Sequence, residues 1–445
     1  MTIINPQFPK GVIENILNNT SLTIRTFTIS DFKEVKEKVL NWAQRFNTFC
    51  FLDNHQYQIE PHSMECLLAA GVKRQLKTQA GDALNQLQQF IDEKKSWLFG
   101  HLGYDLKNEI EKLSSANPDN IQFPDLFFFE PEVIIRLKEN EMIIEAGNPS
   151  AVFAAVSVIS PESDMRVSRV NIQSRFSQEE YISVINKLKQ HILQGDCYEI
   201  NFCQEFFAVD AAINPVEVYK KLSTVSPNPF SALYTMNDQW LLCASPERFI
   251  KKQGNKILSQ PIKGTSKRVA DNKEDEKNKT ELRNSAKDRS ENVMVVDLVR
   301  NDLAKVCGEG TVKVDELYGI YSFPQVHQMI STVSGELKND MPFTEIIKAT
   351  FPMGSMTGAP KKRVMELIEE YEQTKRGIFS GAVGYISPDG DFDFNVVIRS
   401  IIYNAGFKYL SFQAGSAITF YSNPEKEWEE CLMKTEAMKK VLEEK

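Results

Sequence analysis

Strand-like and helix-like patterns alternate along the whole 445-residue chain, and no segment repeats another. Residues 126–159 alternate apolar and polar side chains, as half-buried strands do. Residues 278–306 carry apolar side chains at spacings of three and four, as amphipathic helices do. Interleaved elements of these two kinds predict an α/β (α+β) fold. The ordinary globular composition, 42% hydrophobic and 25% charged, excludes disordered, collagen and coiled-coil proteins.

One polar stretch divides the chain. Residues 160–177 are polar and form the best candidate for a linker. Just after it, Ser177 and Glu180 form the capping-box pattern that opens a helix. We therefore expect an N-terminal region over residues 1–160 and a second region over residues 175–440.

The charge and cysteine content exclude several classes of function. The chain has 52 basic and 60 acidic side chains, whereas a dedicated nucleic-acid binder presents a basic stripe. Its seven cysteines are scattered without a C-x-x-C pair, so neither a disulfide framework nor a zinc site is expected. The N-terminus lacks a signal-peptide pattern, and no apolar run approaches the roughly 18 residues of a membrane span. We expect a cytoplasmic protein that binds neither nucleic acid nor membrane.

Two acidic pairs suggest a metal site. Asp288 and Glu291 are three residues apart on one predicted helix, and Glu427 and Glu430 are three apart on another. Residues at this spacing share a helix face. Two such faces brought together would present four carboxylates, the hard oxygen ligands that suit Mg²⁺. Solvated charged helix faces have the same spacing, so the pattern leaves both interpretations open.

Lys263 and Glu247 are candidates for proton transfer or covalent chemistry. Lys263 lies in the segment PIKGT (261–265), where the flanking proline and glycine favour a stiff turn. If buried, it can lose its proton and act as a nucleophile or base, but it can equally be a loop lysine. Glu247 ends a hydrophobic strand pattern, where burial can raise its pKa and make it a general acid. The alternative is a strand-end ion pair with Arg248.

Three more features can bind an anion or a substrate. Residues 354–361 (GSMTGAPK) form a turn before a helical pattern, and backbone amides at such a turn can hold an anion. Arg399 follows an alternating strand pattern, where a guanidinium can bind a carboxylate with two hydrogen bonds. His327 precedes another strand-like run. A capped helix start, a structural arginine and a core histidine are the respective alternatives.

Together these segments resemble the chorismate-utilising enzyme family. That family includes component I of aminodeoxychorismate synthase and of anthranilate synthase, with isochorismate and salicylate synthases as more distant members. The resemblance implies a large two-sheet β-sandwich flanked by helices, to which both halves of the chain contribute strands. The matching segments, in the family's order, are GDCYEINFCQEF (195–206), SPERFI (245–250), PIKGTSKR (261–268), 285–306, HQMISTVSGEL (327–337), 351–368, 380–400 and PEKEWEECLMK (424–434), with a weaker match at WLFGHLGYD (97–105).

The resemblance assigns the acidic pairs to Mg²⁺. Glu291 and Glu430 match direct ligands of the metal, and Asp288 and Glu427 match the carboxylates that hold metal-bound waters. In the family, the metal in turn binds the ring carboxylate of chorismate. This implied role agrees with the preference of Mg²⁺ for oxygen ligands.

The resemblance also assigns roles around the substrate. Arg399 matches the arginine that binds the enolpyruvyl carboxylate, and Glu247 matches the general acid that helps the 4-hydroxyl leave. His327 matches an active-site histidine beside the ring. The substrate-contacting turn and a glycine loop near the ring carboxylate match Ser355, Thr357, Gly358 and Gly415.

Lys263 selects a branch of the family. Anthranilate and isochorismate synthases carry alanine at this position, whereas enzymes that aminate chorismate at C4 typically carry lysine. Retention of stereochemistry at C4 suggests two displacements, in which a lysine amine attacks C2 and ammonia then attacks C4. Glu199 stands where isochorismate and salicylate synthases place the lysine that activates water, and where the aminating branch more often has glutamine. The expected product is therefore 4-amino-4-deoxychorismate, a precursor of 4-aminobenzoate and folate.

Amination needs a source of ammonia. No G-x-C-x-G nucleophile turn surrounds any of the seven cysteines, so the resemblance implies a separate glutamine amidotransferase subunit as partner. Three alternatives stay open: an anthranilate synthase component I, an isochorismate synthase, and a non-catalytic relative that binds chorismate or a partner. Lys263 argues against the first, Glu199 against the second, and the joint presence of Lys263 and Glu247 against the third.

Overall fold

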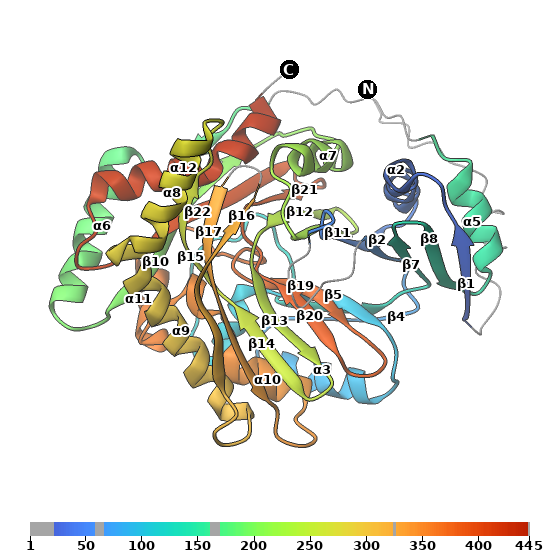
Figure 1. Ribbon diagram of the computed structural model, residues 1–445, viewed down its shortest axis with the longest axis horizontal. Helices are drawn as coiled ribbons and strands as arrows, with labels where there is room; N and C mark the ends of the chain where they lie inside the picture. The colour runs from blue at the N-terminus through green and yellow to red at the C-terminus, as the bar shows by residue number, and fades with distance from the viewer. Residues whose placement is uncertain (1–21, 58–65, 161–169, 324–325, 444–445) are drawn as a thin grey trace.

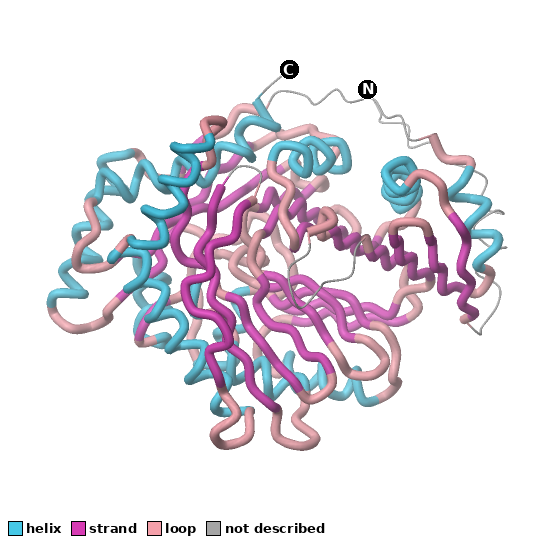
Figure 2. The backbone as a smooth tube through the Cα atoms, viewed as in Figure 1, coloured by secondary structure: helices cyan, strands magenta, loops and turns pink. Residues whose placement is uncertain are grey.

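The computed structural model describes residues 22–57, 66–160, 170–323 and 326–443, which form two large sheets flanked by helices (Figure 1). Every strand pair in these ranges is antiparallel. Figure 2 shows the strands running through the centre of the molecule with the helices outside. The expected two-sheet sandwich is confirmed.

The larger sheet has twelve strands. In spatial order they are β1 (Thr23–Thr28), β8 (Glu141–Ala146), β7 (Val133–Lys138), β3 (Leu67–Ala70), β2 (Thr48–Asp53), β11 (Phe230–Met236), β12 (Gln239–Ser245), β21 (Ser400–Asn404), β22 (Tyr409–Ile418), β10 (Glu199–Ala208) and β18 (Gly358–Ala359), with β9 (Gln173–Ser174) paired to β10.

The smaller sheet has ten strands. In spatial order they are β15 (Ile262–Lys267), β17 (Val326–Glu336), β14 (Lys256–Gln260), β13 (Arg248–Gln253), β20 (Phe392–Asn395), β19 (Ala382–Ile386), β5 (Leu98–Leu102), β6 (Leu126–Glu130) and β4 (Arg74–Thr78), with β16 (Lys313–Ser322) paired to β17. Both sheets therefore contain strands from before residue 160 and from after residue 170, so neither stretch of sequence builds a sheet of its own.

The helices are distributed over both halves of the chain. They are α2 (Phe32–Ala43), α3 (Ala83–Asp92), α4 (Lys107–Glu111), α5 (Pro149–Ser157), α6 (Gln178–Leu193), α7 (Pro215–Val225), α8 (Asn272–Asn284), α9 (Ala286–Val306), α10 (Phe343–Thr350), α11 (Lys361–Tyr371) and α12 (Pro424–Glu443), with short 3₁₀ turns η1 (Tyr104–Leu106) and η2 (Gly354–Met356). None of them is long and apolar enough to span a bilayer.

Two layers of the core meet at the larger sheet, and the alternation of side chains along β2 separates them. Phe49 and Phe51 point into a layer between the larger sheet and its helices, whereas Cys50 points into the layer between the two sheets. Successive residues of a strand face opposite sides, so one short strand supplies both layers. The inter-sheet layer also contains Phe99 of the smaller sheet, whereas Phe394 lies on the opposite face of that sheet, against Phe343 of α10.

Two local predictions have different outcomes. The capping box is confirmed, because the Ser177 hydroxyl accepts from the Glu180 backbone N–H while the Glu180 carboxylate accepts from that of Ser177. The helical pattern over residues 278–306 is interrupted. Ser285 has an extended backbone, ends α8, and caps α9 by accepting from the Asp288 N–H. The new helix therefore begins at Ala286, two residues before the first acidic pair.

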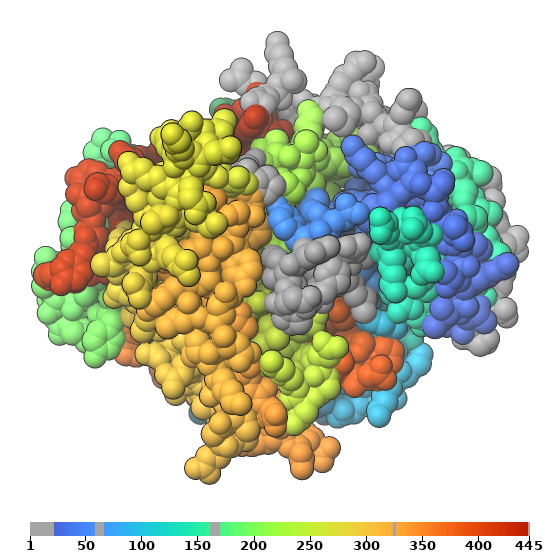
Figure 3. Space-filling model, viewed as in Figure 1, coloured from blue at the N-terminus to red at the C-terminus, as the bar shows by residue number. Residues whose placement is uncertain are grey.

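Helices α8 and α9 pack against the β15 and β17 end of the smaller sheet. In the space-filling view both helices (yellow) flank the orange surface that β16 and β17 form (Figure 3). This packing brings α9, which carries one acidic pair, to the strand that carries Lys263.

Candidate active site

Lys263 and Glu199 meet between the two sheets. Lys263 lies in β15 of the smaller sheet and Glu199 begins β10 of the larger one. Lys263 Nζ donates to Glu199 Oε1 at 2.8 Å, and the residues are only 8% and 1% exposed. The alternative of a solvent-exposed loop lysine is therefore wrong.

Three carboxylates surround the Lys263 ammonium. Burial lowers the pKa of this group, but the charges of Glu199, Glu291 and Glu247 outweigh burial and raise it above the usual range. Lys263 is thus an ammonium in the resting protein. A nucleophilic role requires a nearby group to take its proton.

Gly264 explains how Lys263 reaches α9. Gly264 has a φ of +94°, which favours glycine. A Cβ built there would lie 3.0 Å from both Cβ and Oδ1 of Asp288. The absence of a side chain therefore lets the strand approach the first turn of α9.

Glu247 lies beside this lysine in the turn between β12 and β13, and it is 4% exposed. Burial raises its pKa to about 7, although the Ser355 hydroxyl and the Lys263 ammonium act in the opposite direction. The expected alternative, an ion pair with Arg248, does not form, because Arg248 makes two hydrogen bonds to Asp393 instead. Glu247 therefore holds a proton close to neutral pH, as a general acid must.

Arg399 is a strained and unsatisfied cation. Its φ is +50°, a conformation that costs an arginine about 1 kcal/mol or more. The half-buried guanidinium makes no hydrogen bond or ion pair with any residue in the described ranges, and burial lowers its pKa to about 10, partly offset by Glu247. A cation held this way is ready to bind an anionic group.

Replacing Arg399 with asparagine tests this arrangement. Asparagine tolerates positive φ and carries no charge to desolvate, so we expect the free protein to unfold at the same or a higher temperature. If Arg399 binds a substrate carboxylate, the KM for that substrate should rise by about 30-fold or more, because a charge-assisted contact is lost. Thermal unfolding and steady-state kinetics measure the two effects. A destabilised variant with an unchanged KM would instead mark Arg399 as structural.

The four predicted metal ligands lie on two neighbouring helices. Asp288 and Glu291 are on α9, and Glu427 and Glu430 are on the first turns of α12. Lys287 links the helices, with Nζ 3.4 Å from Glu427 Oε1 and 3.9 Å from Glu291 Oε1. The structure thus brings the two pairs into one neighbourhood, as the resemblance implies.

The donor chemistry of this neighbourhood fits a hard cation. Glu291 Oε1 and Glu427 Oε2 are buried and have no hydrogen-bond partner within the described ranges. Burial raises the pKa of Glu291 to about 7. In the same ranges, no three His, Cys, Asp or Glu side chains converge closely enough to hold a metal ion. Lys287 neutralises part of the negative charge in the observed arrangement.

The turn at residues 354–361 is buried against β10. The Asn201 amide donates to the Ser355 carbonyl, and Gly358 pairs with Ile200. The Thr357 hydroxyl donates to the carbonyl of Met353, the residue just before the turn. The Ser355 hydroxyl faces Glu247 without a well-formed hydrogen bond to any described residue. The alternative of a simple helix start therefore does not describe this turn.

Gly415 and His327 lie in surroundings that differ from those expected. Gly415 is inside strand β22 and not in a loop, and a Cβ there would lie 1.8 Å from the Phe202 carbonyl oxygen. Its own carbonyl accepts from Lys434, which also pairs with Glu430. His327 hydrogen-bonds Ser322 and Asp275 of α8, so the structure gives it structural partners and no contact with Lys263 or Glu247.

Arg376 and Glu372 support the site, and no sequence signal marked them. Their carboxylate–guanidinium contact is 2.6 Å, and both residues are buried. Arg376 also donates to the Asn201 and Met356 carbonyls, and Glu372 accepts from the backbone N–H of Cys203. The pair therefore fixes β10 to the turn that contains Ser355.

Replacing Arg376 with alanine should lower the free energy of unfolding by about 3–5 kcal/mol, because a buried carboxylate loses its partner. Chemical denaturation measures this loss. The matched control is Arg363→Ala, which removes an arginine from exposed ion pairs with Asp196 and Glu366 and should cost under about 1 kcal/mol. Equal losses in the two variants would contradict the role of Arg376.

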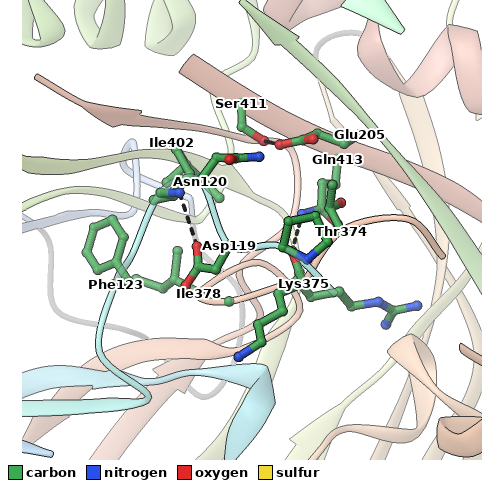
Figure 4. A pocket seen from close by; sticks show the side chains of 14 residues that line it. Asp119, Asn120, Phe123, Glu205, Thr374, Lys375, Ile378, Ile402, Ser411 and Gln413 are labelled. Carbon is green, nitrogen blue, oxygen red and sulfur yellow. Dashed lines mark hydrogen bonds between the residues drawn. The ribbon is translucent and has the colours of Figure 1, made fainter. Parts of the chain in front are cut away.

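A small polar cavity elsewhere in the fold is not the substrate site. It lies between the 118–123 segment, the 374–378 turn and β22 (Figure 4). Its volume is about 10 Å³, enough for one water molecule. Its lining contains none of the predicted site residues, and small-molecule sites are typically roughly 300–1,000 Å³.

The antiparallel two-sheet fold holds a buried lysine among carboxylates, and near them an arginine that is unpaired within the described ranges; together they define an enzyme of the chorismate-utilising class. A sequence profile of chorismate binding enzymes matches residues 38–440, and the chain belongs to that family. It is 36% identical to an anthranilate synthase component I-like protein of Synechocystis, over 78% of this chain and 72% of that protein. It is 33% identical to aminodeoxychorismate synthase component 1 of Escherichia coli, over 82% and 84%.

Solved structures agree on the fold. Anthranilate synthase component I from Streptococcus pneumoniae superimposes with a TM-score of 0.76 at 25% identity, covering 86% of this chain and 94% of that one. The menaquinone-specific isochorismate synthase of Escherichia coli superimposes with a TM-score of 0.75 at 14% identity, covering 97% of each chain. The fold is therefore shared by members with different reactions, and the site must distinguish them.

Proposed function

We propose that this chain is an aminodeoxychorismate synthase component I, which replaces the 4-hydroxyl of chorismate with an amino group. The observation that carries this proposal is Lys263, a buried lysine hydrogen-bonded to Glu199 and adjacent to the protonated Glu247. Supporting it, the chain is 33% identical to proteins of that name from Escherichia coli and Bacillus subtilis.

Arg399, Lys263 and Glu247 each have a separate role in the proposed reaction. Arg399 binds the enolpyruvyl carboxylate and orients the ring. The neutral Lys263 amine attacks C2, the ring double bond shifts, and the C4–O bond breaks as Glu247 donates its proton to the departing oxygen, which leaves as water. Ammonia then attacks C4, the double bond shifts back, and the C2–N bond to Lys263 breaks. The Glu247 carboxylate takes the surplus proton from the new C4 amine.

We also propose Mg²⁺ as the cofactor. Glu291 and Glu430 would hold it directly, with Asp288 and Glu427 through water. When bound, the metal would neutralise the ring carboxylate of chorismate and fix its position. Within the described ranges, Glu291 Oε1 and Glu427 Oε2 are buried without a hydrogen-bond partner, which supports this assignment.

We propose that ammonia comes from a separate glutamine amidotransferase subunit and that the chain acts in the cytoplasm. All seven cysteines are buried thiols, so none is an exposed nucleophile that could hydrolyse glutamine. Unpaired thiols also fit a reducing compartment. High ammonium concentrations should replace the partner in an assay.

Anthranilate synthase component I is the second candidate, because a relative of that name from Saccharolobus solfataricus is also 34% identical to this chain. A product assay distinguishes the two. Purified protein is incubated with chorismate, Mg²⁺ and ammonium at mildly alkaline pH, and the products are separated by chromatography with mass detection. We expect 4-amino-4-deoxychorismate. Anthranilate with pyruvate would favour the second candidate, and isochorismate would show that water adds at C2.

A further inference from the structure

Glu199 is the one carboxylate among the described residues that hydrogen-bonds Lys263. Its second oxygen, Oε2, is buried and has no hydrogen-bond partner within the described ranges. The pair joins the two sheets, so neither side chain moves independently of the core. Such a carboxylate is both a partner for the ammonium and a place for its proton.

The backbone of Glu199 is held as firmly as its side chain. Glu199 pairs with Ala359 in β18, and a Cβ on the adjacent Gly358 would lie 2.0 Å from the Glu199 carbonyl oxygen. The turn at residues 354–361 thus fixes the start of β10. This turn also carries Ser355, which faces Glu247.

We propose that Glu199 is the base that takes the proton of Lys263 before the lysine attacks chorismate. The inference rests on the proposed function and adds a residue to it. The proton moves along the existing hydrogen bond, which converts the ammonium and carboxylate into a neutral amine and a carboxylic acid. When Lys263 is released as an amine in the second displacement, Glu199 returns the proton. No external acid or base is consumed.

The other charged groups facing Lys263 cannot take this role as readily. Glu247, in the turn before β13, is the proton donor to the leaving oxygen and already holds its proton. Glu291, on α9, makes no hydrogen bond to Lys263 within the described ranges and belongs to the proposed metal site. Glu199, from β10, is the remaining group and is already in hydrogen-bond contact.

An internal transfer has a distinctive pH signature. The ion pair and the neutral pair contain the same number of protons, so their ratio does not depend on pH. In Glu199→Gln the amide cannot accept a proton, and Lys263 must release it to solvent. The reactive fraction of the variant then rises about tenfold for each pH unit below the pKa of the lysine.

The experiment compares kcat/KM for chorismate across about pH 6 to pH 9 at saturating ammonium, with wild type and variant measured at each pH. We expect Glu199→Gln to be about 100-fold slower or more near neutral pH, and the ratio of variant to wild type to rise with pH. Dividing the kcat/KM of the variant by that of wild type at the same pH cancels the pH dependence that free ammonia and Glu247 contribute to both. Glu199→Asp keeps a carboxylate and should restore a constant ratio.

Controls separate the possible outcomes. Glu366→Gln, which removes a carboxylate from an exposed ion pair with Arg363, should match wild type. Thermal unfolding of each variant identifies loss of folded protein. A pH-independent ratio for Glu199→Gln, at any activity, would overturn the inference and leave Glu199 with a structural role. If wild type makes no 4-amino-4-deoxychorismate, that result contradicts the proposed function itself and not the role of Glu199 alone.

Discussion

Lys263→Ala should lower kcat/KM for formation of 4-amino-4-deoxychorismate by about a thousandfold or more, because the first displacement of the proposed mechanism loses its nucleophile. The KM for chorismate should change little, since Arg399 and the acidic helices remain. Steady-state assays with ammonium as nitrogen source measure both parameters. Acid quenching and intact-mass measurement of wild type with chorismate should also detect a lysine adduct that the variant lacks.

Two controls sharpen the Lys263 prediction. Lys263→Arg keeps the charge beside Glu199 but cannot act as an amine nucleophile, so it should be as inactive as alanine. Lys252→Ala removes a lysine that pairs with Asp391 at the far end of β13 and should retain activity. Substantial amination by Lys263→Ala would show that ammonia attacks without a covalent intermediate.

Local signals predicted those parts of the fold that depend on neighbouring residues. The Ser177 capping box needs only contacts within one helical turn, so its sequence pattern was sufficient. The break at Ser285 was missed, because the apolar residues with helical spacing all lie after residue 292 and mark no boundary before it. The difference arises from the Ser285 hydroxyl, which accepts from the Asp288 N–H in the first turn of α9 and makes a second helix start favourable.

The candidate site depends even more on contacts between residues that are far apart in the sequence, which local patterns do not predict. Motif comparison named Lys263, Glu247 and Arg399, and the structure places the first two side by side with Arg399 near Glu247. It could not show that Glu199 pairs with Lys263, since these residues are 64 positions apart and belong to different sheets. Arg376 was missed for the same reason. Its contacts with Asn201 and Met356 depend on how the sheets close around the turn at residues 354–361.

Glu247→Gln should lower kcat by about 10²- to 10⁴-fold, because the amide cannot protonate the departing oxygen. The pH profile tests the cause. The pKa of Glu247 is raised to about 7, so wild-type kcat/KM, corrected for free ammonia, should fall as pH rises above this value. The corrected rate of the variant should lack that decrease. A wild-type decrease retained in Glu247→Gln would assign the titrating proton to another group.

Glu247→Gln should lower activity, but at neutral to alkaline pH it should make the folded protein more stable. The folded protein binds the Glu247 proton more tightly than the unfolded chain, whose carboxyl has its ordinary pKa of 4.5. The stabilising effect of this proton is therefore complete below pH 4.5 and is lost as pH rises to about 7. Glutamine needs no proton to be neutral, so at pH values above about 7 the variant should be more stable than wild type by about 1–3 kcal/mol. Chemical denaturation of wild type and variant, once below pH 4.5 and once above about pH 7, measures this difference in the free energy of unfolding. An active-site acid that makes the folded protein less stable at neutral pH, yet is required for turnover, is the pattern expected when a buried carboxyl is retained for catalysis.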